Sequence, residues 1–340
     1  GTRKQAQLVA LAMRKGYALV CLGDANGGRI PDLLGSGFAG VIGDHEGEDF
    51  LGYRIEVDRV PRVTAIMGNA YGDPALWSAV SDFVVMSQGS TLGLSGPSLV
   101  AASVGEALTH EQLAGPDVVA KHTGIVSQVA ESEADCVAAV KRFLSYLPSN
   151  AALPAPIAAG APPHTDPQRL ADIVPAQMNR AYDMHRVIDA VVDAGSFFEL
   201  QPAFGRSLVA GLARLDGRPV GLLANQPMHQ AGVLDASSLA KASRLVDLCD
   251  AFGLPLVFLQ DLPGVMIGAN AERTGVATRL MELYRRLAKA TVPKLTVIVR
   301  KAFGFGWVVM GGAPMGIDYI CAWPTAQIGF MAANNAAHVL

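Results

Sequence analysis

Two glycine turns that follow a repeated segment are the residues of this chain best suited to chemistry. Residues 60–72 recur as residues 292–304, with six of thirteen positions identical and three more closely similar. The first copy leads into Asp73, and the second leads into Phe305 and Gly306. Backbone N–H groups presented at such a turn stabilise an oxyanion as it forms. Two turns that face each other would serve a reaction in which two carbonyl groups both need that help.

Each copy is preceded by an apolar strand that ends in aspartate and by a glycine-bearing loop. Residues 18–24 lead into Gly27 and Gly28, and residues 256–261 lead into Gly264. The sequence therefore predicts one fold unit that occurs twice, with a glycine turn after a buried strand in each copy. A single glycine would be explained more simply by a turn with positive φ. Its recurrence after the same strand favours a functional role.

Residues outside these turns are predicted to have structural roles. Asp24 and Asp261 end strands, where a carboxylate in a loop usually caps a helix. Of the seven histidines, only His229 is placed near the site, because it follows the segment 225–227. The four cysteines lie far apart, show no metal-ligand spacing and are predicted to be buried free thiols: Cys21, Cys136, Cys249 and Cys321.

Composition narrows the class of protein. The chain has 340 residues, 51% of them apolar and 17% charged, which suits large cores or extensive subunit contacts. A net charge of −3 and the lack of a basic run argue against nucleic acid as a partner. The longest apolar runs are strand-sized and broken by Gly or Pro, so no membrane span is predicted. Reduced thiols fit the cytoplasm or an organelle matrix, and we expect the cytoplasm as the location.

Helical and strand patterns alternate along the chain and predict a mixed α/β fold. We expect a first domain at 1–150, a linker at 151–180 and a second domain at 181–340. The predicted helices cover 4–15, 74–81, 131–146, 186–194, a segment from the cap Ser237 to 252, and 274–290. The predicted strands cover 18–22, 62–67, 83–86, 256–260, 295–299 and a hairpin of 207–215 with 219–224 around Asp216-Gly217.

A set of short motifs occurs in a specific order along almost the whole chain. They are Gly27-Gly28-Arg29, residues 92–97, 144–150, Tyr182-Asp183-Met184, 211–217, Ala224-Asn225-Gln226-Pro227, Lys241-Ala242, 248–252, Asp261-Leu262-Pro263-Gly264, Val292-Pro293-Lys294, 300–304 and 322–326. With these motifs the sequence resembles the carboxyltransferase (β) subunit of biotin-dependent acyl-CoA carboxylases, of the propionyl-CoA and methylcrotonyl-CoA carboxylase type.

The resemblance implies two crotonase-like (ββα-spiral) domains related by internal duplication. It implies that the first domain, whose start precedes Gly1, binds acyl-CoA as substrate, and that the second receives biotin carried on a partner protein. A biotin carboxylase and a biotin carrier subunit are the implied partners, because the chain has neither an ATP-binding glycine loop nor a biotinylation sequence. The active site would lie where the first domain of one subunit faces the second domain of another, within a homo-oligomer expected to be a hexamer.

The resemblance also assigns roles to residues of the two turns. Gly72 and Asp73 match the catalytic oxyanion pair for the thioester, and Phe305 and Gly306 match the pair for the biotin ureido carbonyl. No metal and no side-chain base is implied, because the ureido anion left after loss of the carboxyl group can itself remove the α-proton. The residues assigned to substrate binding are Gly27, Gly28, Arg29, Tyr71, Gly304 and Val308. Val308 lies at a position tied to acyl-chain choice, and Arg29 is as well explained by a solvated or ion-paired arginine as by a CoA phosphate contact.

Several positions depart from the family pattern and keep other functions open. Both turns usually read Gly-Gly-Ala, whereas Asp73 brings a carboxylate near the forming enolate and Phe305 brings bulk where biotin would enter. A family histidine is replaced by Val119. One alternative is therefore a biotin-independent decarboxylase of a malonyl-type acyl-CoA. Another is a catalytically silent paralogue in a mixed oligomer, and the acyl group itself stays open.

Overall fold

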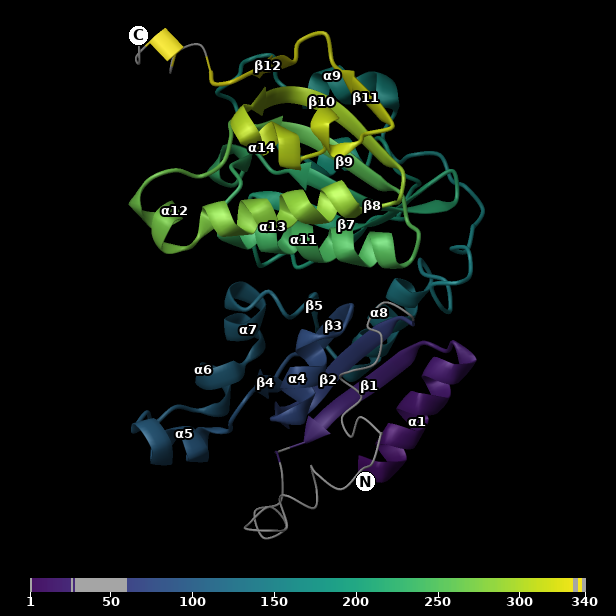
Figure 1. Cartoon of the computed structure of the whole chain (residues 1–340), viewed down its shortest axis with the longest axis vertical. Coiled ribbons are helices and arrows are strands. Elements are labelled where there is room, and N and C mark those ends of the chain that lie inside the picture. Colours follow the sequence, from purple (N-terminus) through teal and green to yellow (C-terminus); the bar gives the residue numbers. More distant parts are fainter. Residues whose placement is uncertain (1, 26, 28–59, 333–335, 338–340) are drawn as a thin grey trace. The chain divides into compact units, whose positions relative to one another are not determined.

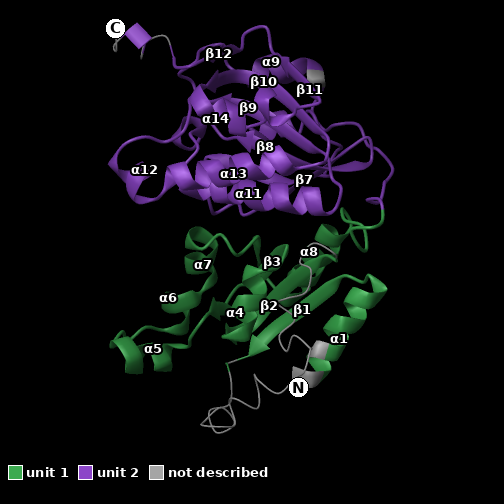
Figure 2. Ribbon diagram, viewed as in Figure 1, with its two compact units in different colours: residues 1–153 green, residues 154–340 purple. Residues whose placement is uncertain are grey.

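The computed structural model describes residues 2–25, 27, 60–332 and 336–337, which form two compact units (Figure 1). Unit 1 comprises Gly1–Leu153 and unit 2 comprises Pro154–Leu340 (Figure 2). Gly28 and Arg29, which are predicted to bind substrate, lie outside the described residues. In the part of the chain that the structure describes, every helix is too short or too polar to cross a membrane.

Unit 1 is built on a parallel sheet with the strand order β1-β2-β3-β5, and β4 pairs with the end of β2. Its strands are β1 (Leu19–Ala25), β2 (Arg62–Tyr71), β3 (Phe83–Ser87), β4 (Thr91–Gly93) and β5 (Gln128–Ala130). Its helices are α1 (Thr2–Lys15), α4 (Asp73–Ala79), α5 (Pro97–Val104), α6 (His110–Ala114), α7 (Pro116–His122) and α8 (Glu133–Leu144).

Unit 2 extends the same plan with an antiparallel ribbon, in the strand order β11-β10-β9-β8-β7-β6 with β12 on the end of β10. Its strands are β6 (Phe198–Leu200), β7 (Leu208–Leu215), β8 (Arg218–Asn225), β9 (Leu256–Leu262), β10 (Lys294–Phe303), β11 (Tyr319–Ala322) and β12 (Gln327–Gly329). Its helices are η1 (Pro167–Arg169), α9 (Leu170–Ile173), α10 (His185–Ile188), η2 (Gln230–Gly232), α11 (Ala236–Ala251), α12 (Ala269–Arg273), α13 (Val276–Lys289), α14 (Gly304–Val309) and η3 (Ala313–Met315).

The duplication predicted from the sequence is visible in the strand pairing. The register between β1 and β2 shifts between Gly23 and Ala25, and the register between β10 and β9 shifts at the matching place, between Ile298 and Ala302. Beyond each shift the long strand gains a new neighbour, which is β4 beside β2 and β12 beside β10. A bulge bends its strand and often lies next to a functional site. Both long strands have their bulge at the matching place and end at equivalent turns.

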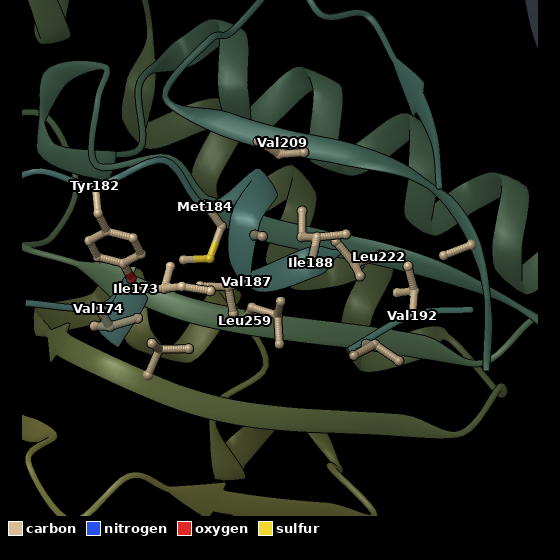
Figure 3. Close-up of a cluster of buried hydrophobic side chains, with 14 of the residues drawn as sticks. Ile173, Val174, Tyr182, Met184, Val187, Ile188, Val192, Val209, Leu222 and Leu259 are labelled. Atoms are coloured by element: carbon tan, nitrogen blue, oxygen red, sulfur yellow. The ribbon is translucent and has the colours of Figure 1, made fainter. Parts of the chain in front are cut away.

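The two sheets differ in how one face is covered. In unit 2 the α10 side chains Val187 and Ile188 pack with Leu222 and Leu259 in a buried cluster (Figure 3). Leu259 is 2% exposed, whereas its counterpart Leu22 in unit 1 is 63% exposed. The continuous apolar run of β9 is typical of a strand in a parallel sheet that is covered on both faces.

Two predicted helices of unit 2 differ from the structure for local reasons. The helix predicted at 186–194 ends at Ile188, and Asp193 instead accepts the N–H groups of Asp216 and Gly217 at 2.8 and 2.7 Å. The helix predicted to start from a Ser237 cap is capped by Asp235, whose carboxylate accepts the Ser238 N–H at 2.7 Å. An ionised acceptor is the stronger cap.

The segment 151–180, predicted as a linker, is packed on unit 2 in several places. Ala158 donates its N–H to the carbonyl of Gly217 at 3.0 Å. Ile173 and Val174 are buried in the cluster of Figure 3. This alanine- and proline-rich segment therefore has no long helix. Its contacts with the rest of unit 2 hold it in place.

Candidate active site

The first turn joins β2 to α4 through Gly72. Gly72 has φ 80° and ψ −121°, a conformation that suits glycine and strains other residues. Its N–H donates to the carbonyl of Gly93 at 3.0 Å, which fixes the end of β2 to β4. Gly72 therefore shapes the turn, and its own N–H is used within the sheet. Pro74 has no N–H, so the donor role predicted for this turn rests on Asp73.

Two predicted binding residues lie beside this turn. A Cβ placed on Gly27 would be 4.0 Å from the carbonyl oxygen of Tyr71, so the loop after β1 passes the end of β2. The Tyr71 side chain is buried, with its hydroxyl 2.8 Å from Nδ1 of His110 at the start of α6. Tyr71 thus braces the turn from within unit 1. Its partner His110 was not predicted to lie near the site.

The second turn repeats this arrangement in unit 2. Gly304 has φ 61°, and a Cβ on Gly264 would be 3.8 Å from the carbonyl oxygen of Phe303, the counterpart of Tyr71. A Cβ on Gly306 would lie 2.6 Å from Cδ1 of Leu262 and 3.2 Å from the backbone of Gly264, so a larger residue there would require these neighbours to shift. Phe305 and Gly306 lie in the first turn of α14, where backbone N–H groups have no acceptor within the helix.

The ring of Phe305 packs against α13. Its centroid lies 5.9 Å from that of Tyr284, with the two rings stacked at 28°. Phe305 remains 45% exposed, and Val308, one turn further along α14, is half-buried. The ring that we expected to bring bulk to this turn is therefore in contact with Tyr284.

A buried ionic cluster fills the bulge of β10 three residues before the second turn. The fully buried carboxylate of Asp261 lies 3.0 Å from Nε of Arg300 and 3.5 Å from Nζ of Lys301. Arg300 also donates to the carbonyls of Gln177 and Arg180 at 2.9 and 2.8 Å. Burial lowers the pKa of Lys301. Asp261 therefore joins two strands ionically, where the sequence had suggested a helix cap.

At the matching bulge of unit 1, the two cationic positions of β10 are occupied by Gly68 and Asn69. Gly68 occupies the place of Arg300, and a Cβ on Gly68 would lie 2.3 Å from Oδ1 of Asp24. The carboxylate of Asp24 packs directly against the backbone of β2, because Gly68 has no side chain there. The two turns therefore share a backbone plan and differ in their electrostatic support.

A second polar cluster lies at the start of α10 and was not predicted. The ring of His185 bridges Asp183 at 2.7 Å and Glu199 at 3.0 Å, and Gln226 donates to Asp183 at 2.7 Å. The hydrogen bond to Glu199, together with Asp183, raises the pKa of His185 to about 9. His229, predicted to lie near the site, is hydrogen-bonded to Arg206 at 3.0 Å. Within the described ranges, His, Cys, Asp and Glu side chains form no group that could hold a metal ion.

The sequence matches a known protein family along almost its whole length. The model of the carboxyl transferase domain family matches residues 3–340. The chain belongs to this family. As a carboxyl transferase domain it spans between 61% and 65% of the length of three curated relatives that it matches.

The relatives of this carboxyl transferase domain are named as carboxylase or decarboxylase subunits. The biotin-dependent acetyl-/propionyl-coenzyme A carboxylase beta5 subunit of Mycobacterium tuberculosis is 37% identical, over 98% of this chain and 61% of the relative. The propionyl-CoA carboxylase beta chain of Saccharopolyspora erythraea is 36% identical, over 99% and 62%. Methylmalonyl-CoA decarboxylase subunit alpha of Veillonella parvula is 34% identical, over 99% and 65%.

Solved structures give the fold of the carboxyl transferase domain. Transcarboxylase 12S, with methylmalonyl-coenzyme A bound, matches with a TM-score of 0.91 and 31% identity over 100% of this chain and 65% of that one. A single-chain, multi-domain long-chain acyl-CoA carboxylase matches with a TM-score of 0.86 and 32% identity over 99% and 32%. These neighbours have a crotonase-like fold with two domains, and so does this chain.

Proposed function

We propose that this chain is a carboxyltransferase subunit that moves a carboxyl group from carboxybiotin to the α-carbon of an acyl-CoA. The observation that carries the proposal is the repeated turn geometry. Gly27 approaches the carbonyl before Gly72 in the same way that Gly264 approaches the carbonyl before Gly304. A reaction with an anionic oxygen on each of two substrates explains why the same turn is built twice.

The chain's own contribution is to stabilise charge on two oxygens. At the first turn the N–H of Asp73 donates to the thioester oxygen as the enolate forms. At the second turn the amides of Phe305 and Gly306 donate to the ureido oxygen. Carboxybiotin would supply the carboxyl group as CO2, and the ureido anion left behind would take the α-proton before the enolate attacks that CO2, so no side-chain base is needed. Each backbone donor in such a site is worth about 3–4 kcal/mol of barrier.

Phe305 is the side chain of the second turn that bears on whether a biotin ring fits there. Phe305, the residue expected to obstruct it, is stacked on Tyr284 of α13. Gly306 lies against Gly264, and a methyl group on Gly306 would come within 3.2 Å of the Gly264 backbone. This arrangement supports transfer more than it supports a decarboxylase without biotin.

The partners and setting follow from the same proposal. A biotin carboxylase and a biotin carrier would supply carboxybiotin, and the chain would act in a homo-oligomer in which unit 1 of one copy faces unit 2 of another. In support, the matching structure of transcarboxylase 12S is a hexamer assembly with methylmalonyl-coenzyme A bound. All four cysteines are free thiols, which fits a reducing cytoplasm, but only Cys136 and Cys249 are buried as predicted, whereas Cys21 and Cys321 are half-buried.

The test is to assay the purified protein, without partner subunits, for CO2 release from a malonyl-type CoA ester and for carboxylation of an acyl-CoA. We expect no CO2 release from malonyl-CoA or methylmalonyl-CoA until biotin is added. We expect carboxylated product when an acyl-CoA and chemically prepared carboxybiotin are supplied together. Rapid CO2 release without biotin would favour the decarboxylase. If the protein neither releases CO2 from these esters nor forms carboxylated product, the silent paralogue is favoured.

A further inference from the structure

The buried ionic cluster behind the second turn carries more positive than negative charge. It holds two cations, Arg300 and Lys301, and one carboxylate, that of Asp261. Their side chains are 2%, 10% and 0% exposed, respectively. Tyr182, whose ring centroid lies 4.9 Å from the Arg300 guanidinium, adds no charge, because burial and the nearby Asp261 raise the pKa of its phenol. With Lys301 protonated, two cations and one anion leave a net charge of +1.

Of the two cations, Lys301 is the less well paired. Arg300 donates to Asp261 at 3.0 Å and also to backbone carbonyls, such as that of Arg180 at 2.8 Å. Lys301 shares the same carboxylate at the longer distance of 3.5 Å. A buried cation that is incompletely paired costs stability. Burial accordingly lowers the pKa of Lys301.

The cluster lies directly behind the second turn. Asp261 is followed by Leu262, whose Cδ1 would lie 2.6 Å from a Cβ on Gly306. Lys301 precedes Gly304 on β10 by three residues, which is about 10 Å of extended strand. Across such a distance inside a protein, a unit charge changes the stability of a forming anion by about tenfold. The excess charge therefore acts on whatever binds at the turn.

The matching bulge of unit 1 shows that the duplicated backbone does not need these cations. Gly68 and Asn69 stand where β10 has its two cations. The side chain of Asn69 instead accepts a hydrogen bond from the hydroxyl of Thr91 on β4 at 2.9 Å. Asp24, the counterpart of the buried carboxylate, is exposed. Because the bulge forms in both units, the strand geometry alone does not explain the excess charge in unit 2.

We propose that Lys301 is a positioning residue for the second turn, and that its charge stabilises the anion formed on the ureido oxygen bound there. The inference rests on the proposed function. Before substrate binds, the excess charge of the cluster is uncompensated. An anion held by the amides of Phe305 and Gly306 supplies the missing negative charge. Lys301 thus favours carboxyl transfer through its electric field, without touching the substrate.

The first test is carboxylation of acetyl-CoA and propionyl-CoA with chemically prepared carboxybiotin. Lys301→Met removes the charge and keeps an unbranched side chain, so it should lower kcat about tenfold and leave KM for the acyl-CoA unchanged. Lys301→Arg keeps the charge and should keep most of the rate. Lys294→Met is the matched control, because Lys294 is 6% exposed, donates to the carbonyl of Ala290 at 2.8 Å and lies seven residues earlier on β10. It should lose stability and retain kcat per folded molecule.

The pH profile of kcat separates a charge effect from a structural one. The groups that face Lys301 are Asp261 from β9, Arg300 on its own strand and the neutral Gln327 from β12. Lys301 is charged below its pKa, which burial lowers, so the wild-type kcat should fall as pH rises through that pKa. Lys301→Arg should not show this fall, because a guanidinium stays protonated. Lys301→Met should have the lower rate and no such fall.

The outcomes separate this inference from the function on which it rests. A wild-type kcat in folded Lys301→Met, or equal losses of kcat in Lys301→Met and Lys294→Met, would overturn the role of Lys301 and leave carboxyl transfer standing. If Lys301→Met does not fold, an unchanged alkaline fall in Lys301→Arg would overturn it in the same way. If the wild-type chain carboxylates neither ester, the proposed function fails and this inference fails with it.

Discussion

Replacing Gly72 by alanine isolates the contribution of the first turn. Gly72 has φ 80°, and a Cβ added there would meet no atom within 4 Å, so the new methyl group causes no clash. The cost is confined to the backbone, where an L residue in such a conformation is strained by about 1–3 kcal/mol. Relief of that strain rotates the peptide between Gly72 and Asp73, which carries the Asp73 N–H.

The chain offers a matched control in Gly89. It has φ 77°, and a Cβ there would also meet nothing within 4 Å, but it lies in the turn between β3 and β4. Both Gly72→Ala and Gly89→Ala should lower the free energy of unfolding by about 1–3 kcal/mol. Only Gly72→Ala should also lower kcat, by about 10²–10³-fold, the usual cost of one lost oxyanion donor.

The assay is carboxylation of an acyl-CoA with carboxybiotin, normalised to folded protein, beside denaturant unfolding of both variants. If Gly72→Ala loses stability to the same extent as Gly89→Ala but keeps the wild-type kcat, the turn has no catalytic role. The assignment of Asp73 as a donor would then be wrong.

Three further perturbations test the surroundings of the site. Asp261→Asn leaves Arg300 and Lys301 buried without their carboxylate and should lower the free energy of unfolding by about 3–5 kcal/mol in denaturant. Asp117→Asn, on a surface pair with Lys121, should change the free energy of unfolding little. Similar unfolding midpoints for the two variants would contradict a buried ionic role for Asp261. His185 has a pKa raised to about 9 in the folded chain, so its stabilisation is present below about pH 6.5 and is lost as pH rises through about 9. Thermal melts from pH 6 to 10 should show this loss, about 1–2 kcal/mol after allowance for solvent screening of the half-buried ring, and His185→Gln should abolish it. Gly306→Ala places a methyl group within 3.2 Å of the Gly264 backbone and should raise KM for carboxybiotin more than KM for acyl-CoA; an unchanged KM for both would remove the biotin assignment of the second turn.

Much of the fold could be predicted because its signals are local. The hairpin around Asp216-Gly217, the long helix before residue 252 and the duplicated strands all show as periodicity or turn chemistry over a few residues. Helix boundaries were less predictable. Asp193, for example, is drawn into a turn by two backbone donors that lie more than twenty residues away in the sequence.

The candidate site was predictable only in its backbone. Glycines at 72 and 304 stand out because they recur, and their roles in catalysis remain predictions. The supports around them join distant residues: His110 meets Tyr71 across 39 positions, and Arg300 meets Asp261 across 39. Nothing in the local sequence distinguishes such partners from solvated side chains, so they could be found only from the fold.

The most direct test of two cooperating turns is the transfer of a labelled carboxyl group from methylmalonyl-CoA to free biotin. The wild-type chain should form labelled carboxybiotin, and Gly72→Ala and Gly306→Ala should each reduce the rate by about 10²–10³-fold while CoA binding is retained. Transfer at the wild-type rate in either folded variant would contradict the claim that both turns stabilise charge in one reaction.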